Sequence, residues 1–350
     1  GLGATGDDIT RNVISRVLER ELRVDRNKEK LLRDWYLKKG RDFRDIDRMQ
    51  ASCPEGGILL DNRVGLAYGF YLRTDHRHIF SLPGVPGEMK NMFLDHIIPI
   101  LEKKALFSSS YRFEILNFSD IAEYTLDRIL QQIVSRYPGI EYGTRASSGI
   151  IRVRFESTST DLSPCLEQTE ERLKDNFIAR GDRALEEIAA ELLVKNSLSL
   201  GVAESCTGGL LSKTVTDIPG SSRYFYGGIV SYSNQAKVSV LGVSPKTLEK
   251  HGAVSDCAAR EMARGVLERL GCDISISITG IAGPSGGSTQ KPVGTVFVCM
   301  CREGSLPEVE KGVFPGDREG IRQRAVNKAL FMLVNLLKGE KVENISGCRH

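Results

Sequence analysis

Apolar and polar residues alternate along this 350-residue chain in patterns that predict three successive segments, at residues 1–105, 110–181 and 182–340. In the first segment, apolar residues at helical spacing are interrupted by short apolar runs typical of strands. The predicted helices cover residues 13–22, 31–39 and 88–101, and the predicted strands cover 58–60, 67–72 and 78–82. Because these strands are too few to form a complete sheet, we expect an incomplete α/β domain here.

The middle segment, after a short loop at residues 107–110, predicts a small α+β module. Strands are expected at residues 112–118, 140–143 and 150–155, and helices at 121–137 and 162–179, in the order β-α-β-β-α. The module is compatible with a spacer, a dimerisation unit or a KH-like domain. Because no GXXG loop lies between helices, we do not expect it to bind RNA.

The last segment predicts a complete α/β domain. Its first helix covers residues 182–195, and a strand at 198–202 leads through a turn into a helix at 210–218. Ser255 is a favourable N-cap for a helix that runs to Leu270. The remaining elements are strands at residues 224–232, 273–279, 293–301 and 309–314, and helices at 234–241, 245–251 and 321–338.

Composition narrows the class of protein without identifying it. A hydrophobic content of 41% and a net charge of +3 are typical of a soluble globular protein, and they argue against a dedicated nucleic-acid or membrane partner. We find no apolar run long enough to span a bilayer and no signal peptide. The eight cysteines form no C-x-x-C pair, which favours a reduced, cytoplasmic protein without a zinc site.

The most informative stretch is A-E-S-C-T-G-G at residues 203–209, which connects a predicted strand to a predicted helix. Such a turn exposes the hydroxyl of Ser205 and directs free backbone N–H groups toward whatever binds there. One interpretation is a nucleophile beside an oxyanion or phosphate site. The alternative is a helix cap with glycines for close packing.

A serine nucleophile needs a base, and the best candidate lies in S-Y-S-N-Q-A-K at residues 231–237. Tyr232 ends a strand and Lys237 lies one turn into the next helix, so both would reach the sheet edge that carries Ser205. A lysine serves as a base only when burial lowers its pKa. Alternatively, Lys237 is solvated and Tyr232 anchors the strand end. His251 has the position of a helix C-terminal residue, which the helix dipole favours.

Two further turns at strand ends have the composition of ligand sites. Thr279 and Gly280 follow a buried strand, and the glycine permits close backbone approach. Arg318 begins a helix after F-P-G-D, which suits a phosphate group. A solvated helix start is the alternative for Arg318. Ligands of α/β sheets collect at such strand ends.

Together these turns strongly resemble the C-terminal domain of the CinA (competence/damage-inducible protein) family. The matching motifs are A-E-S-C-T-G-G, G-S-S, S-Y-S-N-x-x-K, H-G-A-V-S, G-I-A-G-P-x-G-G, K-P-V-G-T-V and F-P-G-D-R, between residues 182 and 338. The first segment is similar to the family's molybdopterin-binding-like domain, through G-L-G-A-T-G-D-D-I-T at residues 1–10 and L-P-G-V-P-G-E-M-K at 82–90. The middle module resembles the family's KH-like linker.

The resemblance implies an amidohydrolase that converts nicotinamide mononucleotide and water into nicotinate mononucleotide and ammonia, in pyridine nucleotide salvage. It assigns Ser205 as nucleophile, Lys237 as base and Tyr232 as their helper. It further implies a homodimer and a reaction that needs no cofactor. The residues it assigns to substrate binding are Thr207, Gly208, Gly209, Asn234, Thr279, Gly280 and Arg318. A non-catalytic nucleotide-binding protein is the alternative.

The N-terminal domain of this chain resembles a domain that, in some family members, hydrolyses ADP-ribose with a divalent metal. Asp7 and Asp8 would be the metal ligands or acids. Three features depart from that pattern. Ala4 and Tyr68 stand where the pattern has proline, and the family's first strands would precede Gly1. A role with DNA, suggested only by the family's name, has no support in the composition.

Overall fold

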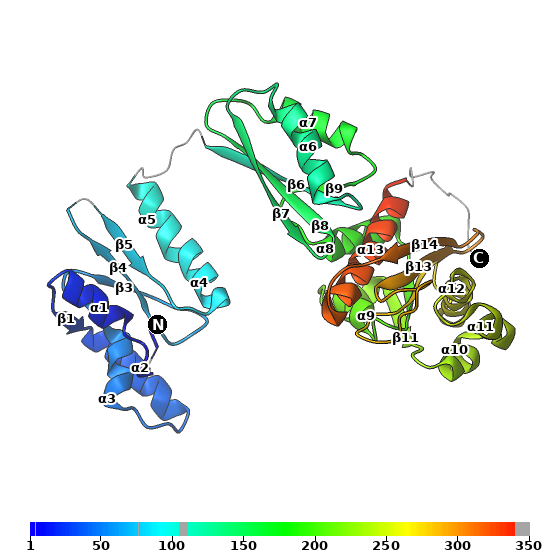
Figure 1. The fold of residues 1–350 in the computed structure, drawn as a ribbon. Helices are drawn as coiled ribbons and strands as arrows, with labels where there is room; N and C mark the ends of the chain where they lie inside the picture. The colour runs from blue at the N-terminus through cyan, green and yellow to red at the C-terminus, as the bar shows by residue number, and fades with distance from the viewer. Residues whose placement is uncertain (4, 76, 105–110, 340–350) are drawn as a thin grey trace. The chain divides into compact units, whose positions relative to one another are not determined.

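The computed structural model describes residues 1–339 except 4, 76 and 105–110, and it divides the chain into two compact units, Gly1–Ser109 and Ser110–His350 (Figure 1). Ala4 and the loop expected at residues 107–110 lie outside the described residues. Both units are mixed α/β, and no helix in the described part of the chain is long and apolar enough to cross a bilayer.

The first unit contains two small antiparallel sheets, one with strand order β1-β2 and one with β3-β4-β5. The helix predicted over residues 13–22 is wrong at its C-terminal end, because it stops at Val17 and Leu22–Val24 pairs with Ser52–Pro54. The elements are α1 (Thr10–Val17), β1 (Leu22–Val24), α2 (Arg26–Lys38), α3 (Asp45–Arg48), β2 (Ser52–Pro54), β3 (Ile58–Leu60), β4 (Gly69–Arg73), β5 (His78–Ser81), α4 (Pro86–Met92) and α5 (Ile98–Lys103).

Arg11 holds the small β1-β2 sheet to the rest of this unit. Its guanidinium is buried and donates hydrogen bonds to the backbone carbonyls of Leu2, Gln50, Ser52 and Tyr68. Burial lowers the pKa of Arg11 to about 10, so the side chain is still charged at neutral pH. The glycine-rich start of the chain is thereby fixed against β2 and the segment before β4.

In the second unit, the middle module folds as one antiparallel sheet of order β7-β8-β6-β9 covered by two helices. The prediction of one helix over residues 162–179 is wrong at its C-terminal end. The helix ends at Arg172, and Phe177–Arg180 is a strand that pairs with β6. The elements are β6 (Arg112–Ser119), α6 (Glu123–Val134), β7 (Ile140–Ser147), β8 (Ile150–Ser157), α7 (Ser163–Arg172) and β9 (Phe177–Arg180).

The last domain is a three-layer structure around a sheet of order β11-β10-β12-β13-β14. Strands β10, β11 and β12 are parallel, β13 is antiparallel to β12, and β14 is antiparallel to β13 and so runs in the direction of the first three. Helices α8, α9 and α13 pack on one face and α12 on the other. The elements are α8 (Leu185–Asn196), β10 (Leu200–Glu204), α9 (Leu210–Thr216), β11 (Phe225–Val230), α10 (Asn234–Leu241), α11 (Pro245–His251), α12 (Asp256–Leu270), β12 (Ile274–Gly280), β13 (Thr295–Arg302), β14 (Glu308–Val313) and α13 (Arg318–Gly339).

The middle module and the last domain are packed together within this unit. Asn327 of α13 donates a hydrogen bond of 2.8 Å to the carbonyl of Ser148, and Lys328 pairs with Asp120. Ile178 of β9 belongs to the same apolar core as α8 and α13. The module therefore shares a core with the domain that carries the candidate site.

Candidate active site

The carboxyl ends of the three parallel strands bring Ser205, Ser231 and Thr279 to one edge of the sheet. The amide of Ser205 donates to the carbonyl of Ile278 over 3.0 Å, and the amide of Ser231 donates to that of Glu204 over 2.8 Å. Parallel pairing therefore continues one residue beyond β10 and β11. This is the edge at which open α/β sheets bind ligands.

Ser205 and Lys237 meet at this edge. The Lys237 Nζ lies 2.9 Å from the Ser205 Oγ, 2.7 Å from the Ser231 carbonyl oxygen and 3.4 Å from that of Tyr232. Lys237 is only 1% exposed. It extends from the first turn of α10, where the Ser233 hydroxyl accepts a hydrogen bond from the amide of Ala236. The serine–lysine contact expected from the two motifs is thus present in the structure.

Burial lowers the pKa of Lys237, because the low-polarity surroundings disfavour the ammonium form. Cys206 acts in the opposite direction only as a thiolate, and burial raises its pKa to about 11. A neutral amine has two N–H groups, which match the two carbonyl acceptors, and one lone pair, which faces the Ser205 hydroxyl. In that state the serine donates to the lysine, as a nucleophile must to its base.

The turn after Ser205 is held by a residue that the sequence analysis did not select. Glu204 is fully buried, and its carboxylate accepts hydrogen bonds from the amides of Gly209 (3.0 Å), Leu211 (3.0 Å) and Ser212 (2.8 Å) and from the hydroxyl of Ser212 (2.7 Å). This carboxylate satisfies the orphan donors of α9. Its position directly before a helix start is the signal that could have identified it.

The glycine turn leaves two backbone donors beside Ser205. Gly208 and Gly209 have φ values of 56° and 94°, a conformation that favours glycine. Their amides donate to the Ser205 carbonyl and to the Glu204 carboxylate. Among the described residues, no backbone carbonyl or carboxylate accepts a hydrogen bond from the amides of Cys206 and Thr207, which follow Ser205 directly in the chain.

Two buried hydroxyls near this turn are available for hydrogen bonding, and one guanidinium holds the turn in place. The Oγ1 of Thr207 and the Oγ of Ser231 are buried without a hydrogen-bond partner among the described residues. The guanidinium of Arg322 donates to the carbonyl of Thr207 and so fixes the turn against α13. The unpartnered hydroxyls are suited to hydrogen bonding with a bound molecule.

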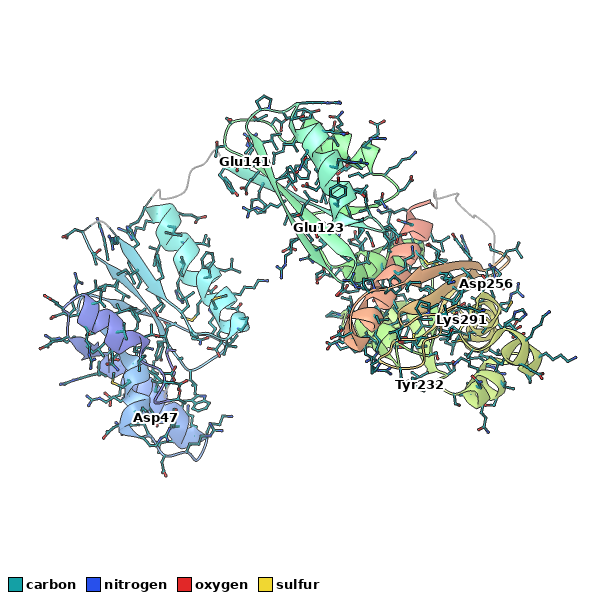
Figure 2. All side chains as sticks on the ribbon, in the orientation of Figure 1. Asp47, Glu123, Glu141, Tyr232, Asp256 and Lys291 are labelled. Carbon is teal, nitrogen blue, oxygen red and sulfur yellow. The ribbon has the colours of Figure 1, made fainter. Side chains whose placement is uncertain are left out.

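Arg318 and Tyr232 contact each other beyond the ends of β11 and β12. Arg318 donates to the carbonyl of Gly283 over 2.7 Å and to the phenol oxygen of Tyr232 over 3.1 Å. Tyr232 is 61% exposed and lies after β11 at the surface of its domain (Figure 2). Its carbonyl contacts Lys237, and its phenol contacts Arg318 rather than the serine–lysine pair. The phenol therefore does not lie between Ser205 and Lys237, where a proton relay would need it.

The other residues predicted to bind substrate differ in their burial and in their hydrogen bonds. The Thr279 hydroxyl donates to the Ala253 carbonyl over 2.7 Å and is buried, so it holds the segment before α12 in place. A side chain at Gly280 would lie 2.7 Å from the Thr295 carbonyl, so only glycine fits there. Asn234 is exposed at the start of α10. His251 ends α11, as its position in the sequence predicted.

Asp7 and Asp8, the predicted metal ligands, do not form a complete ligand set. Asp8 accepts hydrogen bonds from the amide and hydroxyl of Thr5, which lower its pKa to about 2, and Asp7 is exposed. Within the described ranges no three His, Cys, Asp or Glu side chains are grouped to hold an ion. Because the aspartates present do not by themselves fit a bound metal, we derive no chemistry through one.

The chain is a protein of three parts: an α/β domain, a KH-like module and a three-layer α/β domain. The last of these carries a buried serine–lysine pair at its sheet edge. The CinA C-terminal domain model matches residues 182–337, and the model of a probable molybdopterin binding domain matches residues 1–103. The chain belongs to the CinA family of competence-damage inducible proteins.

Relatives match along most of their length. A competence-damage inducible protein of Acetivibrio thermocellus is 37% identical, over 97% of this chain and 84% of the relative. A CinA-like protein of Syntrophomonas wolfei is 36% identical, over 97% and 83%. Among solved structures, a CinA superfamily protein of Klebsiella pneumoniae is 34% identical, covering 45% of this chain and 99% of that one, with a TM-score of 0.43.

Proposed function

We propose that the last domain hydrolyses the carboxamide of nicotinamide mononucleotide to nicotinate mononucleotide and ammonia. The observation that carries the proposal is the 2.9 Å contact between the Ser205 hydroxyl and the buried amine of Lys237, whose pKa is lowered. A neutral amine in contact with a serine hydroxyl can accept its proton, as a general base does. A capped helix start with a solvated lysine would not bury the amine there.

In the first half of the reaction, the Ser205 Oγ attacks the carboxamide carbon and its proton passes to the Lys237 Nζ. The negative charge that develops on the carbonyl oxygen is stabilised by the free amides of Cys206 and Thr207. The bond to nitrogen then breaks, and Lys237 returns the proton to the departing ammonia. The product of this half is an ester of Ser205 with the nicotinate group.

In the second half, water attacks the ester carbonyl while Lys237 accepts one of its protons. The bond to the Ser205 Oγ breaks, and that oxygen recovers the proton from Lys237. Nicotinate mononucleotide leaves as the acid. The reaction balances without a redox partner or cofactor.

The contact of Arg318 with Tyr232 supports a phosphorylated substrate. Arg318 stands at the first residue of α13, where a guanidinium and helix N–H groups together favour a phosphate. The phenol of Tyr232 adds a second donor beside it. The carboxamide would then lie near Ser205 and the phosphate near Arg318, at opposite ends of the substrate.

The test is ammonia release from nicotinamide mononucleotide by the purified chain and by Ser205→Ala. We expect the wild type to release ammonia and the variant to lose activity by a factor of at least about 10³. Ser221→Ala, in the turn before β11, is the matched control and should retain activity. Undiminished ammonia release by Ser205→Ala would overturn the mechanism. Calorimetric binding without any product in the wild type would instead identify a non-catalytic nucleotide-binding protein.

A further inference from the structure

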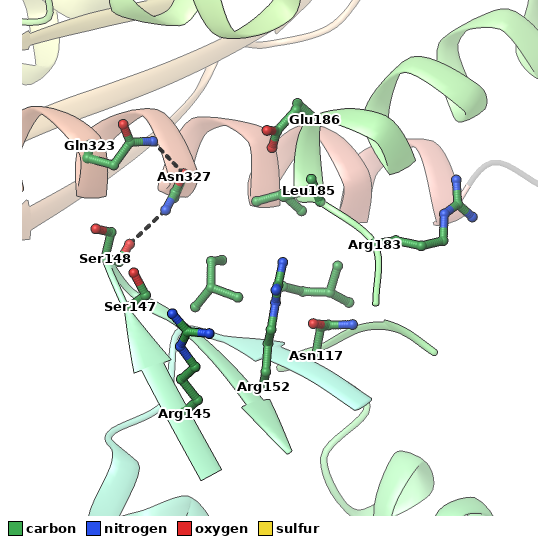
Figure 3. A pocket seen from close by; sticks show the side chains of 13 residues that line it. Asn117, Arg145, Ser147, Ser148, Arg152, Arg183, Leu185, Glu186, Gln323 and Asn327 are labelled. Carbon is green, nitrogen blue, oxygen red and sulfur yellow. Dashed lines mark hydrogen bonds between the residues drawn. The ribbon is translucent and has the colours of Figure 1, made fainter. Parts of the chain in front are cut away.

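A cavity lies between the middle module and the last domain, and neither Ser205 nor Lys237 lines it. It has a volume of about 330 Å³, is partly open to solvent, and lies between the module's sheet on one side and α8 and α13 on the other (Figure 3). Ile150, Ile178 and Leu185 provide apolar surface, and the remaining lining is mostly polar. Its size falls within the range of small-molecule sites.

One row of the module's sheet places two positive charges at this cavity. Arg145 of β7 lies directly opposite Arg152 of β8, so both side chains leave the same face of the sheet. Both line the cavity, and Figure 3 shows them rising from the strands into it. Like charges directly opposite each other are destabilising in an antiparallel pair.

Neutralisation of these two arginines by the protein is incomplete. Arg152 pairs with Asp182 at 2.9 Å, and that aspartate is 68% exposed. For Arg145, the described part of the chain supplies no carboxylate within ion-pair distance. An anionic group bound between the two guanidinium groups would remove the repulsion.

Beside Arg152 on the neighbouring strand lies a buried hydrogen-bond acceptor without a partner among the described residues, the Oδ1 of Asn117. Asn117 of β6 lies directly opposite Arg152 and is 2% exposed. Its Nδ2 donates to the carbonyls of Ala179 (3.1 Å) and Gly181 (2.7 Å), which fixes the orientation of the amide. Its Oδ1 has no hydrogen-bond partner among the described residues, and Figure 3 shows this oxygen turned toward Arg152. Buried acceptors of this kind normally have a partner.

We propose that this cavity binds a phosphorylated small molecule of nucleotide size. The phosphate would bind between Arg145 and Arg152, since guanidinium groups bind phosphate oxygens in paired, charge-assisted hydrogen bonds. A hydroxyl or amino group of the ligand would donate to the Oδ1 of Asn117. The apolar part of the ligand would pack on Ile150 and Ile178. This site is independent of the proposed amide hydrolysis.

The proposal is tested by calorimetry of the full chain with AMP at low ionic strength, and with adenosine as the dephosphorylated probe. AMP should bind, and adenosine should bind at least tenfold more weakly. Arg145→Gln should weaken AMP binding at least tenfold, which corresponds to about 1.4 kcal/mol. The matched control is Arg154→Gln, two residues along β8 and outside the cavity lining, which should bind AMP as the wild type does.

Binding of AMP at the candidate active site is distinguished by Arg318→Gln, which should leave the calorimetric signal of this cavity unchanged. Three results would overturn the proposal: no heat with 1 mM AMP, equal affinity in wild type and Arg145→Gln, or the same loss in Arg154→Gln as in Arg145→Gln. Circular dichroism of each variant establishes that a loss of binding does not reflect unfolding. Ammonia release by Arg145→Gln should equal that of the wild type, since Arg145 lies outside the serine–lysine site.

Discussion

The guanidinium of Arg318 donates a hydrogen bond to the phenol oxygen of Tyr232 across 3.1 Å, although the two residues are 86 positions apart in the chain. The same guanidinium is held from the other side by the carbonyl of Gly283. Arg318 is therefore fixed by two segments of the sheet edge. A side chain held in this way is prepared to bind a phosphate with little loss of conformational freedom.

Arg318→Gln should therefore affect substrate binding more than chemistry. We expect KM for nicotinamide mononucleotide to rise at least about tenfold, because a charge-assisted hydrogen bond is lost, while kcat changes less than threefold. Steady-state ammonia release measures both constants. Nicotinamide riboside, which lacks the phosphate, is the control substrate, and its kcat/KM should be unchanged. An equal loss on both substrates would contradict a role in phosphate binding.

Lys237→Met tests the base, since methionine has a similar length without a titratable amine. We expect kcat to fall by a factor of about 10² to 10⁴, the range of general-base contributions. Lys237→Arg should be as inactive, because a guanidinium remains protonated and cannot accept the serine proton. Ammonia release and thermal unfolding are measured for each variant. Activity of Lys237→Arg near that of the wild type would exclude a proton-accepting lysine.

The pH profile provides a separate test of the lysine. Because burial lowers the pKa of Lys237 from its ordinary value of 10.5, kcat/KM should rise with pH and level off below pH 10.5. The profile is measured from pH 7 upward. Lys237→Met should lose this ascending limb in its residual activity. A limb that persists in the variant would assign the titration to another group.

The titration of Lys237 should also make the free energy of unfolding depend on pH. Between the lowered pKa of the folded state and 10.5, the unfolded chain binds a proton at Lys237 that the folded protein does not. The contribution of this residue to the free energy of unfolding therefore rises with pH in that window. Urea unfolding should show any stability advantage of Lys237→Met narrowing as pH rises through the window. An advantage constant over pH would contradict a pKa lowered by folding.

Local signals in the sequence were sufficient for much of the last domain. The helices Asn234–Leu241, Pro245–His251 and Asp256–Leu270 lie where they were predicted, because serine caps, a first-turn proline and glycine ends mark them. The contact of Ser205 with Lys237 could also be predicted. It depends only on two strand ends reaching the same edge of a parallel sheet.

Features determined by distant partners could not be predicted. The sequence pattern predicts that the residues of β9 continue the preceding helix, because their apolar spacing is helical and only pairing with β6 makes them a strand. The contact of Arg322 with Thr207 spans 115 positions, and no motif marks it. The Asp7 and Asp8 interpretation rested on a motif alone, and the structure gives Asp8 a local partner in Thr5.

Glu204→Gln tests whether the buried carboxylate holds the catalytic turn. The carboxylate accepts four hydrogen bonds from Gly209, Leu211 and Ser212, two on each oxygen. In glutamine an NH₂ group replaces one of these oxygens and cannot accept the two hydrogen bonds made to it. We expect a loss of about 2–3 kcal/mol in the free energy of unfolding, because buried donors are left without a partner at a helix start. Urea unfolding is the measurement.

The same variant should also lower kcat, because the amides of Cys206 and Thr207 lie in the turn that Glu204 fixes. Glu249→Gln, an exposed glutamate of α11, is the matched control for the loss of one negative charge. It should change the free energy of unfolding by less than about 0.5 kcal/mol and leave ammonia release unaltered. If Glu204→Gln were as stable and as active as Glu249→Gln, the turn would be held by the glycine backbone and Arg322 alone. The carboxylate would then have no part in positioning Ser205.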